Sequence, residues 1–189
     1  RLKTEKFMKD YSNIREVLIS KEEISDRVRQ LAAQISADYR DKNPVLVGVL
    51  KGGWVYLADL VREMDIDCEV DFISASSYGK GTTTSGSVKL LKDLTEDVCG
   101  RHVLIVEDII DSGITLSYLK KLIEERNAES VEITALLSKP SRRKVHVDVK
   151  YVGFEIPDKF VVGYGMDFAE KLRGLPEICV LKEEMYKKQ

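Results

Sequence analysis

The sequence contains few of the cysteines and histidines on which disulfide-bonded secreted proteins and many metal-binding proteins depend. Its 189 residues hold three cysteines, two histidines, four prolines and one tryptophan. Cys68, Cys99 and Cys179 are odd in number and form no Cys-x-x-Cys pair, so we expect reduced core thiols in a cytosolic, cytoplasmic protein. His102 and His146 stand alone, which argues against a histidine metal site.

Long apolar runs and a surplus of one charge are also missing. The apolar run Val45–Leu50 is far too short to cross a bilayer, and no apolar signal core follows the charged residues 1–6. We therefore expect no membrane partner and no secretion. Thirty basic and 32 acidic residues give a net charge of -2, so nothing overall points to nucleic acid. A hydrophobic content of 43% suits one domain with a sizeable core.

The most informative stretch is 103–116, which predicts a strand, a turn and a helix. Residues 103–106 are apolar and mostly β-branched, as in a fully buried strand, and two carboxylates follow at its expected carboxyl end. Small and polar residues fill 111–115. Apolar side chains then recur at helical spacing, and a second apolar run over 131–137 completes a β-α-β crossover.

This arrangement suits a ligand that combines phosphate, sugar hydroxyls and a divalent cation. Ligands of open parallel sheets bind at the carboxyl ends of the strands. Amides of 111–115 at a helix N-terminus favour phosphate, whereas Glu107 and Asp108 suit hydroxyl groups or Mg²⁺. The plainer alternative is a surface turn with solvated acids and an Asp N-cap.

The same stretch, together with the sequence FEIPDKFVVGYGMD at 154–167, resembles the type I phosphoribosyltransferases. The second motif resembles their 6-oxopurine branch, which acts on hypoxanthine and guanine. The resemblance covers about 11–183. It implies an α/β fold, with an open, mostly parallel twisted sheet flanked by helices and a small hood subdomain. We expect a single domain over 1–189, with a core at about 20–140 and a hood from about 145–189 plus the N-terminal segment.

The resemblance also implies a reaction in purine salvage. The 5-phosphoribosyl group of 5-phosphoribosyl 1-diphosphate would move to N9 of hypoxanthine or guanine, giving IMP or GMP and diphosphate, with Mg²⁺ as cofactor. Relatives form dimers and tetramers, so a homo-oligomer is implied. Two alternatives stay open: a transferase of the same fold acting on xanthine, and an RNA-binding regulator, which only the basic cluster 142–144 supports. Lys139 and Phe160 argue against a pyrimidine.

Residue by residue, the resemblance assigns a role to each part of the site. The nucleotide-binding positions are Glu107, Asp108, Asp111, Ser112, Gly113, Ile114 and Thr115. Ile114 replaces a basic residue found in relatives, which puts one phosphate contact in question. Diphosphate would meet Lys51, Gly52, Ser77, Tyr78 and Arg173. The base would meet Lys139, Phe160, Val161 and Asp167. Mg²⁺ would meet Glu107, Asp108 and Asp167.

Three chemical expectations follow. The purine loses a proton as it attacks, and Asp111, which also has to cap the phosphate turn, is placed to accept it. Lys139 is a pure donor that matches O6 of a 6-oxopurine and opposes the 6-amino group of adenine. The Gly- and hydroxyl-rich stretch 76–87 predicts a lid that excludes water, and it contains no Walker A loop.

Local patterns elsewhere predict further elements. Ser20 and Glu23 form a capping box ahead of an apolar helix face. Residues 145–151 alternate between apolar and polar, as in a half-exposed strand. Residues 160–162 and 178–181 are expected to be short strands.

Overall fold

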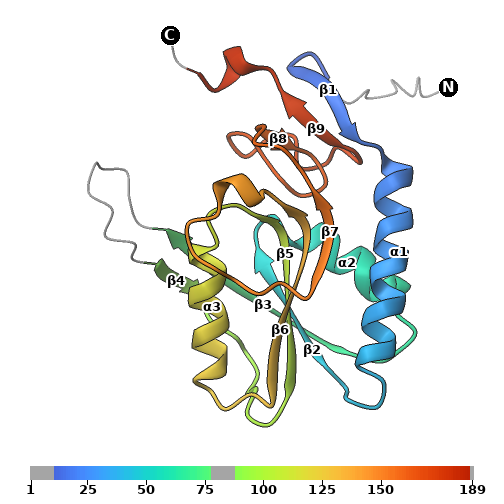
Figure 1. Cartoon of the computed structure of the whole chain (residues 1–189), viewed down its shortest axis with the longest axis vertical. Helices are drawn as coiled ribbons and strands as arrows, with labels where there is room; N and C mark the ends of the chain where they lie inside the picture. The colour runs from blue at the N-terminus through green and yellow to red at the C-terminus, as the bar shows by residue number, and fades with distance from the viewer. Residues whose placement is uncertain (1–10, 78–87, 188–189) are drawn as a thin grey trace, which may run out of the picture.

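The computed structural model describes residues 11–77 and 88–187 and contains two sheets (Figure 1). The larger sheet has the order β4-β3-β2-β5-β6-β7, and only β4 is antiparallel to its neighbour. Its strands are β2 (Val45–Leu50), β3 (Glu69–Ser77), β4 (Val88–Lys92), β5 (His102–Ile110), β6 (Ser130–Ser138) and β7 (Tyr151–Glu155). The expected open, mostly parallel sheet is confirmed.

Helices cover both faces of this sheet because its strands are apolar on both faces. In β2, Val45 and Val47 pack with α3 (Ile114–Glu124), whereas Leu46 faces α1 (Lys21–Asp38) and α2 (Trp54–Glu63). Figure 1 shows α1 and α3 on opposite sides of the sheet. Continuous apolar runs of this kind are typical of parallel strands buried on both faces.

Helix α1 begins as the sequence predicts. The Ser20 hydroxyl accepts the Glu23 backbone N–H at 3.2 Å, and the Glu23 carboxylate accepts the Ser20 N–H at 2.8 Å. This reciprocal pair satisfies two amides that the helix cannot satisfy itself. The expected apolar face is buried along its whole length: Ile24, Val28, Leu31, Ala32 and Ile35.

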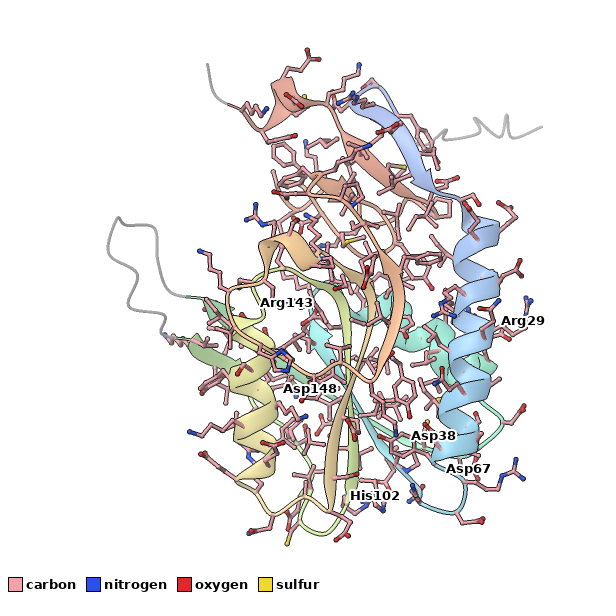
Figure 2. All side chains as sticks on the ribbon, in the orientation of Figure 1. Arg29, Asp38, Asp67, His102, Arg143 and Asp148 are labelled. Carbon is pink, nitrogen blue, oxygen red and sulfur yellow. The ribbon has the colours of Figure 1, made fainter. Side chains whose placement is uncertain are left out.

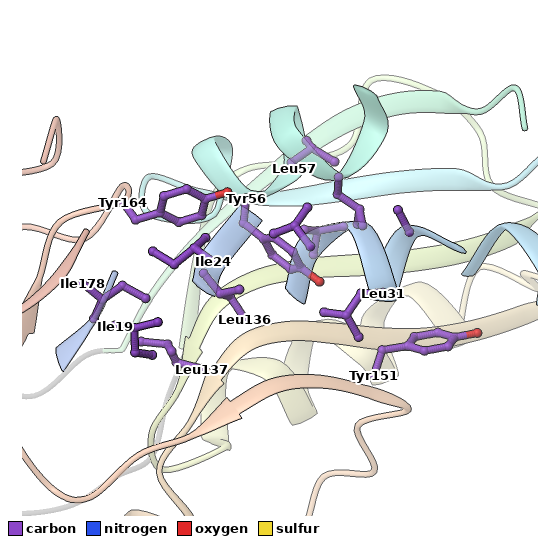
Figure 3. Close-up of a cluster of buried hydrophobic side chains, with 14 of the residues drawn as sticks. Ile19, Ile24, Leu31, Tyr56, Leu57, Leu136, Leu137, Tyr151, Tyr164 and Ile178 are labelled. Atoms are coloured by element: carbon purple, nitrogen blue, oxygen red, sulfur yellow. The ribbon is translucent and has the colours of Figure 1, made fainter. Parts of the chain in front are cut away.

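The smaller sheet sits at the carboxyl end of the large one. Its order is β1-β9-β8, and its strands are β1 (Ile14–Ile19), β9 (Ile178–Leu181) and β8 (Val161–Val162), all antiparallel. Figure 3 shows how one apolar cluster joins it to the helices. Ile19 and Ile178 of the small sheet lie in that cluster with Ile24 of α1 and Tyr56 of α2. The hood is therefore anchored through buried apolar contacts.

One expected strand is corrected by the structure. Residues 145–150 form no strand, and β7 begins only at Tyr151. Because β7 runs parallel to β6, the chain between them has to return to the amino end of the sheet. The segment 139–150 makes that return, so it cannot pair in the ladder. Its alternation instead packs Val147 and Val149 against the α3 face.

The division into core and hood remains a prediction, although β7, within the range expected for the hood, pairs with the large sheet.

The thiols are free: Cys179 is buried and Cys68 half-buried, but Cys99 is exposed, which corrects its expected place in the core. None of the helices formed by 11–77 and 88–187 has the length and apolarity needed to span a membrane.

Candidate functional site

The centre of the candidate site is the end of β5. The strand continues four residues beyond the expected 103–106, so Glu107 and Asp108 lie within it and not just after it. Glu107 pairs in register with Ala135 of β6, and both carboxylates are 9% exposed. The flanking ladder therefore holds two acidic side chains side by side in a nearly buried position.

Burial of this pair has an electrostatic consequence. Burial, followed by the negative charge of Asp108, raises the pKa of Glu107 well above its ordinary value. The Asp108 backbone N–H donates to Glu107 at 3.2 Å, which offsets only part of that effect. Two neighbouring buried carboxylates favour a cation or hydroxyl donors beside them.

The turn that follows is open to an anion. Gly113 has a φ of 81° and is the N-cap of α3, so the N-cap residue brings no side chain to the turn, and the Ser112 hydroxyl accepts the Ile114 backbone N–H at 3.4 Å. The Ser112 carbonyl accepts the N–H groups of Lys144 and Val145. A Cβ on Gly113 would lie 2.7 Å from the Val145 carbonyl oxygen, so only glycine fits beneath this segment.

Asp111 does not cap the turn, which corrects that expectation. Its Oδ1 atom is buried and has no hydrogen-bond partner in the described chain. Lys139 Nζ lies 3.6 Å from this oxygen and Arg142 Nε lies 3.7 Å from it. Asp158 is 4.0 Å from Lys139 Nζ and 3.4 Å from Arg142 Nη1. The side chain therefore turns away from the helix and towards two cations.

The Arg143 side chain links the backbone at Asp111 to the end of β6 through two hydrogen bonds. It donates to the Asp111 carbonyl at 3.0 Å and to the Ser138 hydroxyl at 2.9 Å. Figure 2 places Arg143 above α3, whereas His102 lies at the opposite end of the molecule. Arg142 and Arg143, two members of the basic cluster 142–144, are thus engaged at the site.

Two adjoining cavities share the residues Asp108 and Asp111. One of about 250 Å³ is lined by the phosphate turn, Glu107 and the β2–α2 turn. The other, of about 640 Å³, is lined by Lys139 together with Phe160, Val161, Asp167 and Tyr186. Because both cavities contain Asp108 and Asp111 in their walls, a single ligand with two ends can occupy both.

The β2–α2 turn packs directly against the acidic pair. A Cβ on Gly52 would lie 1.7 Å from Asp108 Oδ2, so the turn approaches the carboxylate as closely as glycine permits. Gly165 of the hood packs in turn on the Gly52 carbonyl, where a Cβ would lie 2.2 Å away. Lys51, Asp108 and the hood are thereby brought to one point of the cleft.

A charged loop at 167–173 closes this side of the site. Arg173 donates to the Gly165 carbonyl at 2.8 Å and pairs with Asp167 at 3.0 Å. The Asp167 carboxylate also accepts the Glu170 backbone N–H at 2.8 Å. Glu170 pairs with Lys51 at 3.0 Å and with Arg173 at 3.3 Å. Arg173 thus reaches the site through Asp167 and Gly165.

Aromatic rings form the far wall of the larger cavity. Phe160 stacks on Tyr186 with ring centroids 5.0 Å apart and an interplanar angle of 23°. Phe168 meets Phe160 edge-on at 5.7 Å. Phe160 is 36% exposed, so part of its surface is free to stack on a flat ligand.

For the remaining residues that were predicted at the site, the structure gives less information. Ile114 begins α3 but does not line either cavity. Ser77 ends β3, where its backbone pairs with Val88. Tyr78 and most of the expected lid, 78–87, lie outside the described residues.

Sequence reasoning missed Arg142, Asp158, Glu170 and Tyr186 as neighbours of the site. Asp158 belongs to the motif at 154–167, which could have identified it. Glu170 stands next to that motif. Arg142 belongs to the basic cluster 142–144, but its partners lie elsewhere in the chain, and Tyr186 carried no local signal.

Comparisons with known proteins agree with this geometry. A family model described as phosphoribosyl transferase domain matches residues 18–169. The hypoxanthine-guanine phosphoribosyltransferase of Bacillus subtilis is 52% identical over 174 residues, covering 92% of this chain and 97% of the relative. A bifunctional protein TilS/HprT of Listeria innocua is 51% identical over 93% of this chain, which spans 27% of that protein's length.

Solved structures give the same result. A hypoxanthine phosphoribosyltransferase from Staphylococcus aureus superimposes with a TM-score of 0.91 and 43% identity, covering 94% of this chain and 97% of that one. A hypoxanthine-guanine phosphoribosyltransferase from Bacillus anthracis gives a TM-score of 0.86 and 48% identity, covering 89% of this chain and 99% of that one. The chain therefore belongs to the phosphoribosyl transferase domain family, and within it to the hypoxanthine-guanine phosphoribosyltransferases.

Proposed function

We propose that the protein transfers the 5-phosphoribosyl group of 5-phosphoribosyl 1-diphosphate to N9 of hypoxanthine or guanine, releasing diphosphate. The observation that carries this proposal is the shared wall of the two cavities, in which Asp108 and Asp111 face both. A ribose at that junction would have its 5-phosphate on one side and the base on the other. The family relationship supports the same reaction.

The phosphate turn supplies binding without a cationic side chain. Backbone amides at the start of α3 and the hydroxyls of Ser112 and Thr115 are donors suited to a terminal phosphate. Glu107 and Asp108 then accept from the ribose hydroxyls. As the diphosphate departs, positive charge develops on the ribose, and the same carboxylates stabilise it electrostatically.

Asp111 is the candidate base. The Asp111 side chain is 46% exposed and lines both cavities, so its carboxylate is within reach of a purine N–H group. Lys139 and Arg142, both within 4 Å of its Oδ1 atom, place two positive charges beside the carboxylate. Asp111 would take the purine proton while the base attacks the ribose.

Mg²⁺ fits the residues present, although no three metal-ligating side chains converge within the described ranges. Magnesium usually binds one or two carboxylates and the phosphates of its substrate, and Glu107 and Asp108 place two neighbouring carboxyl groups in the wall of the smaller cavity. When bound, the metal would neutralise charge on the leaving diphosphate. Asp167 is a further candidate ligand, although Arg173 and an amide already occupy its oxygens.

Base recognition rests on Lys139, which is 7% exposed, and on Phe160. Lys139 Nζ lies 3.6 Å or more from its two carboxylate neighbours, so its donors can turn to a purine O6. A 6-oxopurine matches such a donor, and adenine does not. Backbone carbonyls of Val161 and Asp167 are candidates for accepting the 2-amino group of guanine.

A spectrophotometric assay with 5-phosphoribosyl 1-diphosphate and Mg²⁺ tests the proposal. We expect turnover with hypoxanthine and guanine, and little with adenine. Preferred turnover of xanthine would replace the substrate assignment by the same-fold alternative. Absence of turnover with every purine would reject the transferase reaction.

The RNA-binding alternative is weakened, because two of the three residues in the cluster 142–144, Arg142 and Arg143, are engaged with Asp111, Asp158 and Ser138. Titration of labelled RNA at several salt concentrations would test it directly. Tight, salt-dependent binding would restore that alternative. The homo-oligomer remains a prediction that sedimentation of the purified protein would check.

A further inference from the structure

The side chain of Glu170 occupies an unusual position for an acidic residue near a site that binds anions. Its Oε2 atom lies 3.0 Å from Lys51 Nζ and 3.3 Å from Arg173 Nη2. These are two of the cations expected to meet diphosphate. One carboxylate oxygen therefore bridges both, across 119 residues of chain between Lys51 and Glu170.

Arg173 does not need Glu170 for its orientation. Its Nη1 donates to the Gly165 carbonyl at 2.8 Å, and its Nη2 lies 3.0 Å from Asp167 Oδ1. These partners fix the guanidinium plane from the hood side. Removing the Glu170 carboxylate would leave both of them in place, so Arg173 would stay where it is.

Lys51 is in the opposite situation. Its side chain is 66% exposed, and Glu170 is the acceptor that the structure gives its ammonium. The hydrogen bond from Lys51, followed by that from Arg173, lowers the pKa of Glu170, so the carboxylate is charged at neutral pH. An ion pair this exposed is weak, and a more highly charged anion can displace it.

We infer that Glu170 is a built-in counter-ion that competes with diphosphate for Lys51 and Arg173. This inference rests on the proposed function, because it assumes that diphosphate binds at these two cations. In the structure the carboxylate pairs with both cations. When diphosphate binds, its oxygens replace the Glu170 carboxylate, and when product leaves, the carboxylate returns and favours release. Glu170 thereby weakens the binding of diphosphate and sets the affinity of this subsite.

The test is calorimetric titration of wild-type protein and of Glu170→Gln with inorganic diphosphate and Mg²⁺. Gln keeps the size of the side chain and the backbone N–H bond to Asp167, but removes the charge. We expect Glu170→Gln to bind diphosphate about 2- to 10-fold more tightly at low salt, from the modest strength of exposed ion pairs. The difference should shrink in high salt, because exposed charges are screened.

Glu16→Gln is the matched control. Glu16 also forms a solvent-accessible ion pair, with Lys159 on the hood at 2.7 Å, and does not line either cavity of the site. It changes the net charge of the protein by the same amount, so we expect unchanged diphosphate binding. Glu170→Ala serves as a second variant and should tighten binding in the same direction.

Steady-state kinetics give an independent measurement. We expect Glu170→Gln to lower KM for 5-phosphoribosyl 1-diphosphate with little effect on KM for the purine, and to increase inhibition by diphosphate. If both Glu170 variants bind diphosphate as the wild type does, or more weakly, Glu170 is not a competitor and the inference is overturned. If wild-type protein binds no diphosphate, the proposed diphosphate subsite fails, and the inference fails with it.

Discussion

The buried Asp111 oxygen shows how chemistry at this site depends on single atoms. A carboxylate oxygen that is shielded from water and has no donor within the described chain costs free energy unless a ligand or charge compensates it. Lys139 and Arg142 provide charge at 3.6 and 3.7 Å, beyond hydrogen-bond length. The two positive charges therefore compensate the negative charge of this oxygen without donating a hydrogen bond to it.

The Asp111→Asn variant should retain both substrates and lose most of its turnover. An amide cannot accept the purine proton, and general-base catalysis is typically worth about 10²- to 10⁴-fold in rate. The measurement is kcat and KM for hypoxanthine and guanine. Asp148→Asn, which changes an exposed carboxylate that pairs with His146, is the control and should behave as wild type. A kcat near the wild-type value in Asp111→Asn would remove Asp111 from this role.

Lys139→Gln should weaken both 6-oxopurines and narrow their advantage over adenine. The purine O6 would lose a charge-assisted donor worth roughly 1.5–3 kcal/mol, or about 10- to 150-fold in kcat/KM. The amide oxygen of Gln could also accept from the 6-amino group of adenine. The measurement is kcat/KM for hypoxanthine, guanine and adenine, with the exposed Lys144→Gln variant as control. A 6-oxopurine change within about twofold would refute base recognition by Lys139.

At the scale of elements, the site is assembled from turns that approach one another more closely than side chains allow. The β2–α2 turn at Gly52 meets Asp108 of β5, and the hood meets the same turn at Gly165. Each of these elements is short and regular. Their junctions have room only for hydrogen atoms, so glycine is required by packing against a neighbour, and not only by local backbone conformation.

Gly52→Ala should therefore destabilise the protein and disturb the acidic pair. Its Cβ would overlap Asp108 Oδ2 at 1.7 Å and Cγ at 2.6 Å, and overpacking of a buried site typically costs about 1–3 kcal/mol. Urea unfolding measures the loss, and KM for 5-phosphoribosyl 1-diphosphate should rise with it. Gly174→Ala is the control, because a Cβ there meets nothing within 4 Å. Equal stability of the two variants would contradict the packing argument.

At the scale of the whole molecule, the Asp71 carboxylate of β3 links the large sheet to the segment between β4 and β5. Asp71 of β3 is 7% exposed and accepts the backbone N–H groups of Thr95 at 2.7 Å and Glu96 at 3.1 Å. Burial alone would raise the pKa of Asp71, but these bonds and that from Phe72 lower it below its ordinary value of 3.8. Folding therefore favours the ionised form.

Asp71→Asn should lower the free energy of unfolding at pH 7 by about 1–3 kcal/mol, since hydrogen bonds to a charged group are lost or weakened. A lowered folded pKa contributes stability above the unfolded pKa, and that contribution is lost as the pH falls through the folded value. The gap between wild type and variant should thus close below about pH 3.8. Urea unfolding at pH 7 and at acid pH measures it, with the exposed Asp26→Asn as control. A pH-independent gap would show that charge plays no part.

Local sequence determined the elements of this protein and the kind of chemistry they carry. Apolar runs of β-branched residues, a capping box and a Gly-containing turn depend on neighbours within a few positions, so β2, α1 and the β5–α3 unit could be predicted from their own residues. The carboxylates of β5 could be placed at the ligand-binding edge of a parallel sheet for the same reason. The prediction of a strand at 145–150 was wrong, because an alternating pattern indicates that one face of a segment is buried but does not show that the segment pairs with another strand.

Only the tertiary structure decided which side chains meet. Arg142 lies against Asp111, Tyr186 against Phe160, and Glu170 against Lys51, all through contacts between segments that no local pattern connects. The physical reason is that such contacts depend on the order of the strands, the return path of 139–150 and the docking of the hood. Each of these depends on the packing of the whole core, which short-range sequence patterns do not specify.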